Sequence, residues 1–448
     1  MKQSLKNMQI STIKFSQIED RIDAEYYKPE YLEVKEKLDK SKGVKFLGDI
    51  VNVIMNGVEF RTYFSTGKPY LRVSDIKEIF MDLSDVKYIP ENIEFSKDIE
   101  LLDGDVLTSR SGTLGISAMA PKVGSIISSH LIKISPKKEI NSYYLVVFLN
   151  SRYGRLQILQ KNNGAVVPEI NQPSLKSLKI LVPSQSFQQK IEEMVREAQE
   201  KRKLADEKYK EAEEILNKEL GLEDLNLSTQ KTFESKFSEV EDRLDSEYYQ
   251  LKYKKIISKL KNQKSASLGE MVKIRKGIEV GHEAYTNEGK PFIRVQDFDE
   301  KELAVSGSTN YIRPYLYEEL KKNHKPNAGE IIFSKDGTVG RAFVIRKDNN
   351  EFIVSGGILI LTPRDIDNYY LSFVLNSLAV KSQTVRESIG AIIQHLSVEE
   401  IKNLQIPILS QPLQQKISSL IQESFKLRQE AKELIKEAKV KVEEMIEK

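Results

Sequence analysis

The sequence repeats itself, and this duplication constrains the possible folds more than any other feature. FSQIEDRIDAEYYKPEY, which begins at Phe15, matches FSEVEDRLDSEYYQLKY, which begins at Phe237. Further matches follow in the same order along the chain and end with SQSFQQKI from Ser184 and SQPLQQKI from Ser410. Chance similarity between unrelated segments does not produce a collinear series of this length. The chain therefore contains one fold used twice.

Composition agrees with two soluble globular units. The chain has 448 residues, of which 40% are hydrophobic and 30% charged, enough for two cores and their connections. It has no cysteine, which excludes disulfides, thiolate catalysis and cysteine-ligated zinc. The N-terminal residues lack the apolar stretch of a signal peptide, and no later segment has the apolar length of a membrane span. We therefore expect a cytoplasmic protein without a membrane partner.

The net charge does not by itself indicate a nucleic-acid-binding protein. The chain has 69 Lys and Arg residues against 66 Asp and Glu residues, a formal charge of +3. Many nucleic-acid binders have a larger basic excess. Any such contact must come from a local patch or be shared with a basic partner.

Each repeat contains a globular portion, at residues 43–185 and 265–411. The expected strands are PYLRVSDI, DVLTSR, SIISSHLIKISP and LKILVP in the first copy, and PFIRVQDF, EIIFSK, EFIVSGGILILTP and NLQIPIL in the second. One helix is expected in each copy, at YYLVVFLNSRYGRLQILQ and YYLSFVLNSLAVKSQTVRE, where apolar residues recur at three and four positions. These patterns predict two tandem α+β domains that are mainly β.

A long helix follows each globular portion, at residues 186–222 and 412–448. Apolar residues at roughly heptad spacing interrupt a sequence of Lys, Glu, Gln and Arg. They are Ile191, Met194, Val195, Ala198, Ala205, Tyr209, Ala212, Ile215 and Leu216 in the first helix, and Ile417, Leu420, Ile421, Ser424, Leu427, Ala431, Leu434, Ile435, Ala438, Val442 and Met445 in the second. Each helix should be roughly 50 Å long at about 1.5 Å per residue. Because each apolar stripe needs a partner, we expect the two helices to form an antiparallel coiled coil.

The two remaining segments, residues 1–42 and 223–264, contain the RIDAEYY and RLDSEYY motifs and a short helix. The second segment comes directly after the first long helix, whereas the first lies at the far end of the sequence from the second long helix. We expect the N-terminal segment to pack near the C-terminal helix. The duplicated chain would then have an approximate two-fold axis.

This order of motifs resembles the specificity (S) subunit of type I restriction-modification systems over nearly the whole chain. The resemblance rests on RIDAEYYKPEY and RLDSEYYQLKY, GKPYLRV and GKPFIRV, SRSGTLG and SKDGTVG, and LKILVPSQSFQQKI and LQIPILSQPLQQKI. It implies that each globular portion is a target recognition domain that reads half of a split DNA sequence. It also implies that the helices set the spacing and hold two methyltransferase subunits, optionally joined by two ATP-dependent nuclease and translocase subunits. S-adenosylmethionine, Mg and ATP would then belong to those partners, and this chain would carry no cofactor.

Three pairs of loops offer side chains suited to double-stranded DNA. Arg and Lys can read guanine or hold phosphate, Asn and Gln suit adenine, and Gly permits close backbone approach. The alternatives are tight turns with solvated charges and ordinary polar loop residues. The candidates are Arg61 and Tyr63 with Arg275, Lys276, His282 and Tyr285 in the first pair; Arg110, Ser111 and Thr113 with Lys335, Asp336, Thr338 and Arg341 in the second; and Lys161, Asn162 and Asn163 with Gln394 and His395 in the third.

Other polar residues are assigned to the scaffold. Arg72 and Arg294 occupy the same mid-strand position in both copies, and His130 is expected within a strand. The four histidines are scattered, so a metal or nucleophile site is not expected.

The sequence indicates an adaptor and not an enzyme. It has no Asn/Asp-Pro-Pro-aromatic motif, no Gly-rich cofactor loop after a strand and no Walker-type phosphate loop. Two alternatives stay open. The duplicated domains could form a protein-protein scaffold, or the chain could serve a partner in which methylation and cleavage activities are fused.

Overall fold

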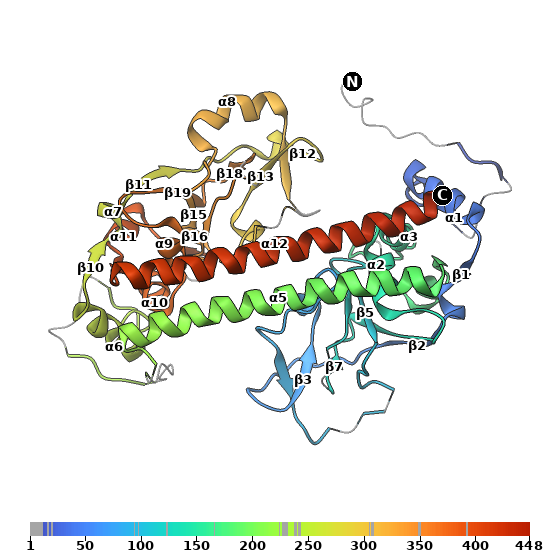
Figure 1. Cartoon of the computed structure of the whole chain (residues 1–448), viewed down its shortest axis with the longest axis horizontal. Coiled ribbons are helices and arrows are strands. Elements are labelled where there is room, and N and C mark those ends of the chain that lie inside the picture. Colours follow the sequence, from blue (N-terminus) through green and yellow to red (C-terminus); the bar gives the residue numbers. More distant parts are fainter. Residues whose placement is uncertain are drawn as a thin grey trace. The chain divides into compact units, whose positions relative to one another are not determined.

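The structure, a computed structural model, describes residues 12–448 apart from 16–17, 19–20, 94, 97, 122–123, 165, 224, 226–231, 237–239, 241–242, 304, 306–308, 348–350 and 391–392. The chain divides into two units. Unit 1 is formed by Met1–Arg202 and Gln429–Lys448, and unit 2 by Lys203–Arg428. Each unit contains one globular portion of the repeat, as the colours of Figure 1 show.

Unit 1 is built on two small sheets. Four antiparallel strands have the order β2-β8-β5-β6, three strands have the order β4-β3-β7, and β1 pairs with β9. The strands are β1 (Val44–Phe46), β2 (Val51–Asn56), β3 (Lys68–Leu71), β4 (Lys87–Ile89), β5 (Val106–Ser109), β6 (Ser117–Met119), β7 (Ile126–Ile127), β8 (Leu131–Pro136) and β9 (Lys179–Leu181). The helices outside the long pair are η3 (Ala24–Tyr27), α1 (Pro29–Lys40), η4 (Leu47–Asp49), η5 (Val73–Asp75), α2 (Ser142–Asn150), α3 (Arg152–Gln160) and α4 (Gln172–Lys176).

Unit 2 repeats this plan. Its sheets have the orders β11-β19-β15-β17 and β12-β14-β13-β18, and the pairs β10-β21 and β16-β20 complete it. The strands are β10 (Ser265–Ser267), β11 (Val272–Lys276), β12 (Tyr285–Thr286), β13 (Lys290–Ile293), β14 (Asn310–Ile312), β15 (Ile331–Ser334), β16 (Asp336–Gly337), β17 (Ala342–Val344), β18 (Ile353–Val354), β19 (Ile358–Pro363), β20 (Gln394–His395) and β21 (Gln405–Pro407). The helices are α6 (Leu251–Lys261), α7 (Leu268–Met271), η7 (His282–Ala284), η8 (Val295–Asp297), α8 (Pro314–His324), α9 (Asn368–Leu375), α10 (Leu378–Glu387) and α11 (Val398–Asn403).

A helix that is apolar on all sides lies in the core of each unit. In α2, every residue from Tyr144 to Asn150 is buried, as expected for a helix without a polar face. The Tyr144 hydroxyl donates to the Leu181 carbonyl at 2.8 Å, and in unit 2 the Tyr370 hydroxyl donates to the Pro407 carbonyl at 3.0 Å. Burial raises the pKa of both phenols, that of Tyr370 to about 12. The buried tyrosine thereby connects α2 to β9 in unit 1 and α9 to β21 in unit 2.

The prediction of one helix at YYLVVFLNSRYGRLQILQ, and one at its counterpart, was wrong. Two helices, α2 and α3, replace the first, and α9 and α10 replace the second. The chain breaks at Ser151, whose extended backbone and side chain cap α3. The side-chain amide of Asn150, the last residue of α2, pairs with both backbone groups of Ser117, accepting at 3.1 Å and donating at 2.7 Å. Asn376 does the same with Ala342 in unit 2.

We expect Asn376→Leu to destabilise unit 2 by about 1–3 kcal/mol, because the Ala342 groups lose their partner inside the core. Chemical unfolding followed by circular dichroism measures the change. Asn403→Leu, on an exposed position of α11, is the matched control and should stay within about 0.5 kcal/mol of the parent. Equal effects of the two substitutions would contradict the role of Asn376.

Two further predictions about strands were wrong. SIISSHLIKISP is not one strand but β7 and β8, with His130 in an exposed turn between them, and EFIVSGGILILTP likewise divides into β18 and β19. Arg72 and Arg294 are not mid-strand, because each follows the last strand residue and precedes a 3-10 turn. Their scaffold role is supported by contacts, since Arg72 pairs with the buried Asp75 at 2.9 Å.

The long helices α5 (Gln185–Leu220) and α12 (Gln411–Glu447) begin and end within about two residues of the predicted ranges. Within unit 2 they are antiparallel, since Ser424 donates to the Ala205 carbonyl at 2.7 Å while Lys416, earlier in α12, lies 3.7 Å from Glu211, later in α5. Most stripe residues are buried, but Met445 is exposed and Ile446 is buried in its place. Among the described residues, no helix has the length and hydropathy needed to cross a membrane.

The short helices of the repeat contact the ends of the long helices. In unit 1, Lys37 of α1 lies 3.3 Å from Glu447, and the Ser41 hydroxyl donates to the Ile446 carbonyl at 3.2 Å. In unit 2, Gln263, just after α6, donates to the Glu219 carbonyl at 3.3 Å.

Candidate nucleic-acid interface

The turn that follows β5 is built by a serine and two glycines. The buried Ser109 hydroxyl donates to the Thr113 carbonyl at 2.5 Å and accepts from the Ile116 amide at 2.9 Å. Gly112 and Gly115 have φ angles of 75° and 74°, a region that favours glycine. Ser334, Gly337 and Gly340 form the same turn after β15. Both turns are thus fixed from inside, while Thr113 and Thr338 are exposed.

Each turn is hydrogen-bonded to the third predicted loop of its own unit. The Ile170 amide donates to the Arg110 carbonyl at 3.0 Å, and Ser111 forms a β-bridge with Glu169. In unit 2 the Leu396 amide donates to the Lys335 carbonyl at 2.9 Å, and Asp336 pairs with His395 in the short sheet β16-β20. The structure therefore brings the second and third predicted loops together in both units.

The side chains on this shared frame differ between the units. In unit 1, Arg110 forms an ion pair with Glu169, and the Ser111 hydroxyl lies 2.7 Å from Nδ1 of His130. In unit 2, Asp336 is placed between the Lys335 ammonium, at 2.6 Å, and the His395 imidazole. The two frames thus present different arrangements of donors and acceptors.

The Asn and Lys residues of the third loop in unit 1 contribute unequally. The Asn162 side-chain oxygen accepts from the amides of Gly164 and Glu169, so it shapes the loop. The exposed Asn163 donates to the Ser174 hydroxyl at 3.1 Å, and Lys161, which caps α3, is half-buried. In unit 2, Gln394 is half-buried and His395 is exposed.

The first loop of unit 1 lies against the turn between β7 and β8. Val58 forms a parallel bridge with Ser128, and Ser129 donates to Glu59 at 3.0 Å. Arg110 donates to the Ser129 carbonyl at 3.3 Å, which connects this turn to the second loop. The β7-β8 turn is therefore the link between the first loop and the other two.

Arg61 and Tyr63 lie on the first loop of unit 1 and are both exposed. Arg61 forms an ion pair with Glu59 at 3.1 Å, and the Tyr63 hydroxyl donates to the Phe60 carbonyl at 3.2 Å. The Ser129 hydroxyl and Arg61 lower the pKa of Glu59, which favours its ionised form. An ionised carboxylate can accept from the amino group of cytosine.

In the first loop of unit 2, His282 and Tyr285 have edge-to-face rings 5.9 Å apart, and Lys276 is exposed at the end of β11. Arg275 is different, because its guanidinium lies 2.5 Å from the buried Glu330 and also donates to the Asn323 carbonyl at 2.8 Å. The contacts of Arg275 are therefore those of a scaffold residue. Arg341 is half-buried beyond the turn and donates to the Phe298 carbonyl at 3.4 Å.

Sequence reasoning did not find Glu59, His130 and Glu169, whose side chains bond to predicted residues. His130 is predicted within a strand, but it lies in the exposed turn between β7 and β8. Glu59 and Glu169 are ordinary loop acids in the sequence, and only the fold places them beside Arg61 and Arg110.

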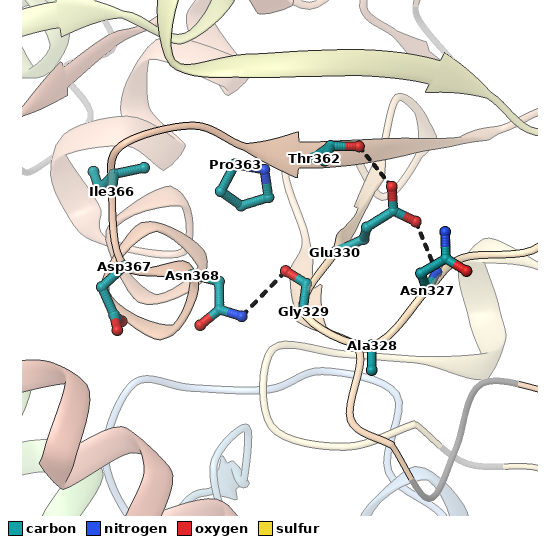
Figure 2. Close-up of a pocket in the computed structure, with 9 residues that line it drawn as sticks. All are labelled: Asn327, Ala328, Gly329, Glu330, Thr362, Pro363, Ile366, Asp367 and Asn368. Atoms are coloured by element: carbon teal, nitrogen blue, oxygen red, sulfur yellow. Dashed lines mark hydrogen bonds between the residues drawn. The ribbon is translucent and has the colours of Figure 1, made fainter.

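A pocket of about 480 Å³ in unit 2 is the opening that Figure 2 shows, next to Glu330. The Glu330 carboxylate accepts from the Asn327 amide at 2.7 Å and from the Thr362 hydroxyl at 2.5 Å, and Asn368 donates to the Gly329 carbonyl at 3.1 Å. These hydrogen bonds hold residues 327–330 against residues 362–368. In the part of the chain that the structure describes, no group of three or more metal-ligating side chains is present.

The family whose profile matches the chain is described as the type I restriction modification DNA specificity domain. It matches twice, over residues 39–214 and 260–440. The chain belongs to this family. The two matches correspond to the two copies of the repeat, so the specificity subunit has two DNA recognition domains, as the resemblance in the sequence implied.

Individual proteins are also similar to the chain. The specificity subunit of the type I restriction enzyme MjaIX from Methanocaldococcus jannaschii is 23% identical over 394 residues, which are 86% of each chain. Among solved structures, the type I S subunit from M. genitalium has 15% identity and a TM-score of 0.42 over 92% of this chain and 97% of that one. The specificity subunit from Thermoanaerobacter tengcongensis has 17% identity and a TM-score of 0.28 over 91% of this chain and 96% of that one.

Proposed function

We propose that this specificity subunit reads a bipartite, asymmetric DNA target, with one half-site for each recognition domain. The observation that carries the proposal is the repeated frame with different side chains: Arg110, Ser111 and Glu169 in unit 1 against Lys335, Asp336 and His395 in unit 2. A common backbone positions the readers, and the side chains supply the base preference. Because the two sets differ, the two half-sites should differ in sequence.

The helices α5 and α12 support a role in spacing. They have 36 and 37 residues, which at about 1.5 Å per residue give lengths of roughly 50 Å. This length equals about 15 base pairs at about 3.4 Å each. Two readers joined by such a spacer would leave an unread middle segment in the target.

Catalysis is assigned to partner subunits. Two methyltransferase subunits, docked in part on the long helices, would bind S-adenosylmethionine and modify adenine, and two further subunits would add ATP-dependent cleavage. The proposed DNA contacts are the turn residues Arg110, Ser111, Lys335 and Asp336, the other predicted residues that the structure leaves exposed, and the bonded neighbours Glu59, His130 and Glu169.

Exchange of residues 43–185 for the corresponding domain of another family member should change one half-site and leave the other and the spacer length unaltered. Mapping of methylated adenines in the host genome reads both half-sites at once. A change in both half-sites would contradict the modular reading.

Arg110→Ala should weaken binding to the unit 1 half-site by about 1–3 kcal/mol, roughly 5- to 150-fold, whereas Lys45→Ala, an exposed cation paired with Glu139, should have no such effect.

A gel-shift comparison of the chain alone and with its methyltransferase partner separates this proposal from a protein scaffold. Sequence-specific binding should appear at least in the complex. Its absence in both samples would leave the scaffold function as the better account.

A further inference from the structure

An imidazole contacts the turn residue of each unit, but the two imidazoles come from different loops. In unit 1 it is that of His130 in the β7-β8 turn, whose Nδ1 lies 2.7 Å from the Ser111 hydroxyl. In unit 2 it is that of His395 in the third loop, whose Nδ1 contacts the Asp336 carboxylate. The place of His130 is taken in unit 2 by Gly357, whose carbonyl accepts the matching amide of the turn at 2.9 Å. The histidine has therefore changed loop between the two copies.

The contact partner decides which nitrogen of each ring carries a hydrogen. A serine hydroxyl can donate or accept, so Ser111 leaves both tautomers available to His130. An ionised carboxylate only accepts, so the hydrogen of the neutral His395 ring lies on Nδ1, facing Asp336. In unit 2 the tautomer is thus fixed, and Nε2 of the neutral ring is an acceptor.

Backbone bonds hold the His395 ring in this position. Asp336 and His395 are paired in the short sheet β16-β20, and the amide and carbonyl of His395 bond to Ile389 at 2.8 and 3.0 Å. The Lys335 ammonium donates to the second carboxylate oxygen of Asp336 at 2.6 Å, so both oxygens accept. The His395 side chain is 48% exposed, and its Nε2 bonds to none of the described residues. A fixed acceptor on the candidate interface is therefore available to a donor outside the chain.

Of the charged residues that the structure describes, Asp336 is bonded to the ring, and Lys335 acts on it through Asp336. Other charged groups on the elements before and after β20, and on the first loop, have contacts of their own: Arg386 with Glu387 in α10, Glu399 with Lys402 and Glu400 with Ser397 in α11, and Glu279 beside Gly356. Histidine changes charge between about pH 5 and 8, and the protonated ring donates from both nitrogens. A fall in pH therefore turns Nε2 from an acceptor into a donor.

We propose that Nε2 of His395 reads an exocyclic amino group, N6 of adenine or N4 of cytosine, in the unit 2 half-site. Both amino groups donate into the major groove, whereas guanine and thymine present an oxygen acceptor at the same place. Protonation of the ring reverses this preference. The inference rests on the proposed function, since the ring acts only if unit 2 binds DNA, and it adds the chemical class of the base and a dependence on pH.

The test measures binding of the full chain with its methyltransferase partner, without S-adenosylmethionine, to targets altered at one base pair. A G·C pair for A·T, or a deoxyuridine·A pair for C·G, replaces the amino group by an oxygen at the same place of the groove. Each position of the unit 2 half-site except the methylated adenine is altered in turn. Competition gel shifts at about pH 8 should show roughly tenfold weaker binding at one position, and the replacement that causes it identifies adenine or cytosine. At about pH 5.5 the loss should fall below about threefold.

His395→Asn distinguishes a base contact from a structural role. The asparagine amide can still donate to Asp336 but has no Nε2, so discrimination should disappear at both pH values while the circular dichroism spectrum stays unchanged. Asp336→Asn lets either tautomer form and should reduce the discrimination at about pH 8. His324→Asn is the matched control, because the His324 ring bonds to the Lys276 carbonyl at 2.9 Å, outside the shared frame. Its discrimination should equal that of the parent at both pH values.

The remaining outcomes separate this inference from the proposed function. Discrimination that does not change with pH, or that survives in His395→Asn, would overturn the inference and leave the proposed function standing. Absence of sequence-specific binding by the parent complex at both pH values would contradict the proposed function itself.

Nitrogen-15 NMR of the histidine-labelled chain without DNA tests the tautomer independently. The His395 signal is assigned from its loss in His395→Asn, and at about pH 8 it should show the hydrogen on Nδ1. A hydrogen on Nε2 would overturn the inference whatever the DNA result.

Discussion

Lys133→Met should destabilise unit 1 by about 3–5 kcal/mol, the range for a buried ion pair that loses one partner. The Lys133 ammonium is almost fully buried and lies 3.2 Å from the carboxylate of the buried Asp105. It also donates to the carbonyls of Asp98 and Glu100 at 2.9 and 2.6 Å. The substitution leaves a carboxylate and two carbonyls in the interior without their cation. Chemical unfolding followed by circular dichroism measures the loss.

In unit 2 the equivalent buried carboxylate and two carbonyls receive their cation from a different strand. Glu330 takes the place of Asp105, and Arg275 on β11 supplies the cation and donates to the carbonyls of Asn323 and Lys325. Arg275 is paired across the sheet with Ile360 on β19, and Lys133 on β8 is paired with Met55 on β2. The cation and the apolar residue have therefore exchanged strands between the two copies.

This exchange supplies the control for Lys133→Met. The triple variant Met55→Arg, Asp105→Glu and Lys133→Ile transplants the unit 2 arrangement into unit 1 and should recover most of the lost stability. A loss below about 1 kcal/mol for Lys133→Met, or no recovery in the triple variant, would contradict the account of a shared buried network.

The long helices and the duplication could be predicted from the sequence because both depend on local or repeated patterns. The heptad stripe of α5 and α12 gives the helix bounds directly, since it is a property of residues three and four apart. The break between α2 and α3 is different. At this break Asn150 pairs with Ser117 on β6, a contact between distant residues that no periodicity reveals.

The candidate interface likewise contains features that the local sequence predicts and contacts that only the fold reveals. The Gly turns after β5 and β15 were predicted because a left-handed φ favours glycine at fixed positions. The partners of those turns, Glu169 and His395, lie on loops about 59 residues later, as the bonds Arg110 to Glu169 and Asp336 to His395 show. Arg275 is ambiguous in the sequence for a related reason, since an arginine at a strand end suits DNA contact or the scaffold equally well until Glu330 is placed beside it.

Gly57→Ala should disable the unit 1 half-site, because the first loop passes the β7-β8 turn too closely for a side chain. A Cβ at Gly57 would lie 1.9 Å from the Ile127 carbonyl oxygen. The backbone must then move away, which breaks the bonds from Val58 to Ile127 at 2.9 Å and from Ser129 to Val58 at 3.0 Å. We expect the free energy of unfolding of unit 1 to fall by roughly 3 kcal/mol, at the upper end of the range for overpacking. Binding to the unit 1 half-site should fall at least tenfold, because Ser129 also positions Arg110.

Two substitutions test whether this effect is local. Gly124→Ala adds the same methyl group in unit 1 at a position with no other described residue within 4 Å, and it should leave unfolding and DNA binding unchanged. Gly277→Ala places a Cβ 2.0 Å from the Ser355 carbonyl oxygen and should disable the other half-site only. Competition gel shifts with targets altered in one half-site distinguish the two. Each glycine lies against backbone of its own unit. If Gly57→Ala and Gly277→Ala weakened the same half-site, the two loops would therefore not serve separate readers.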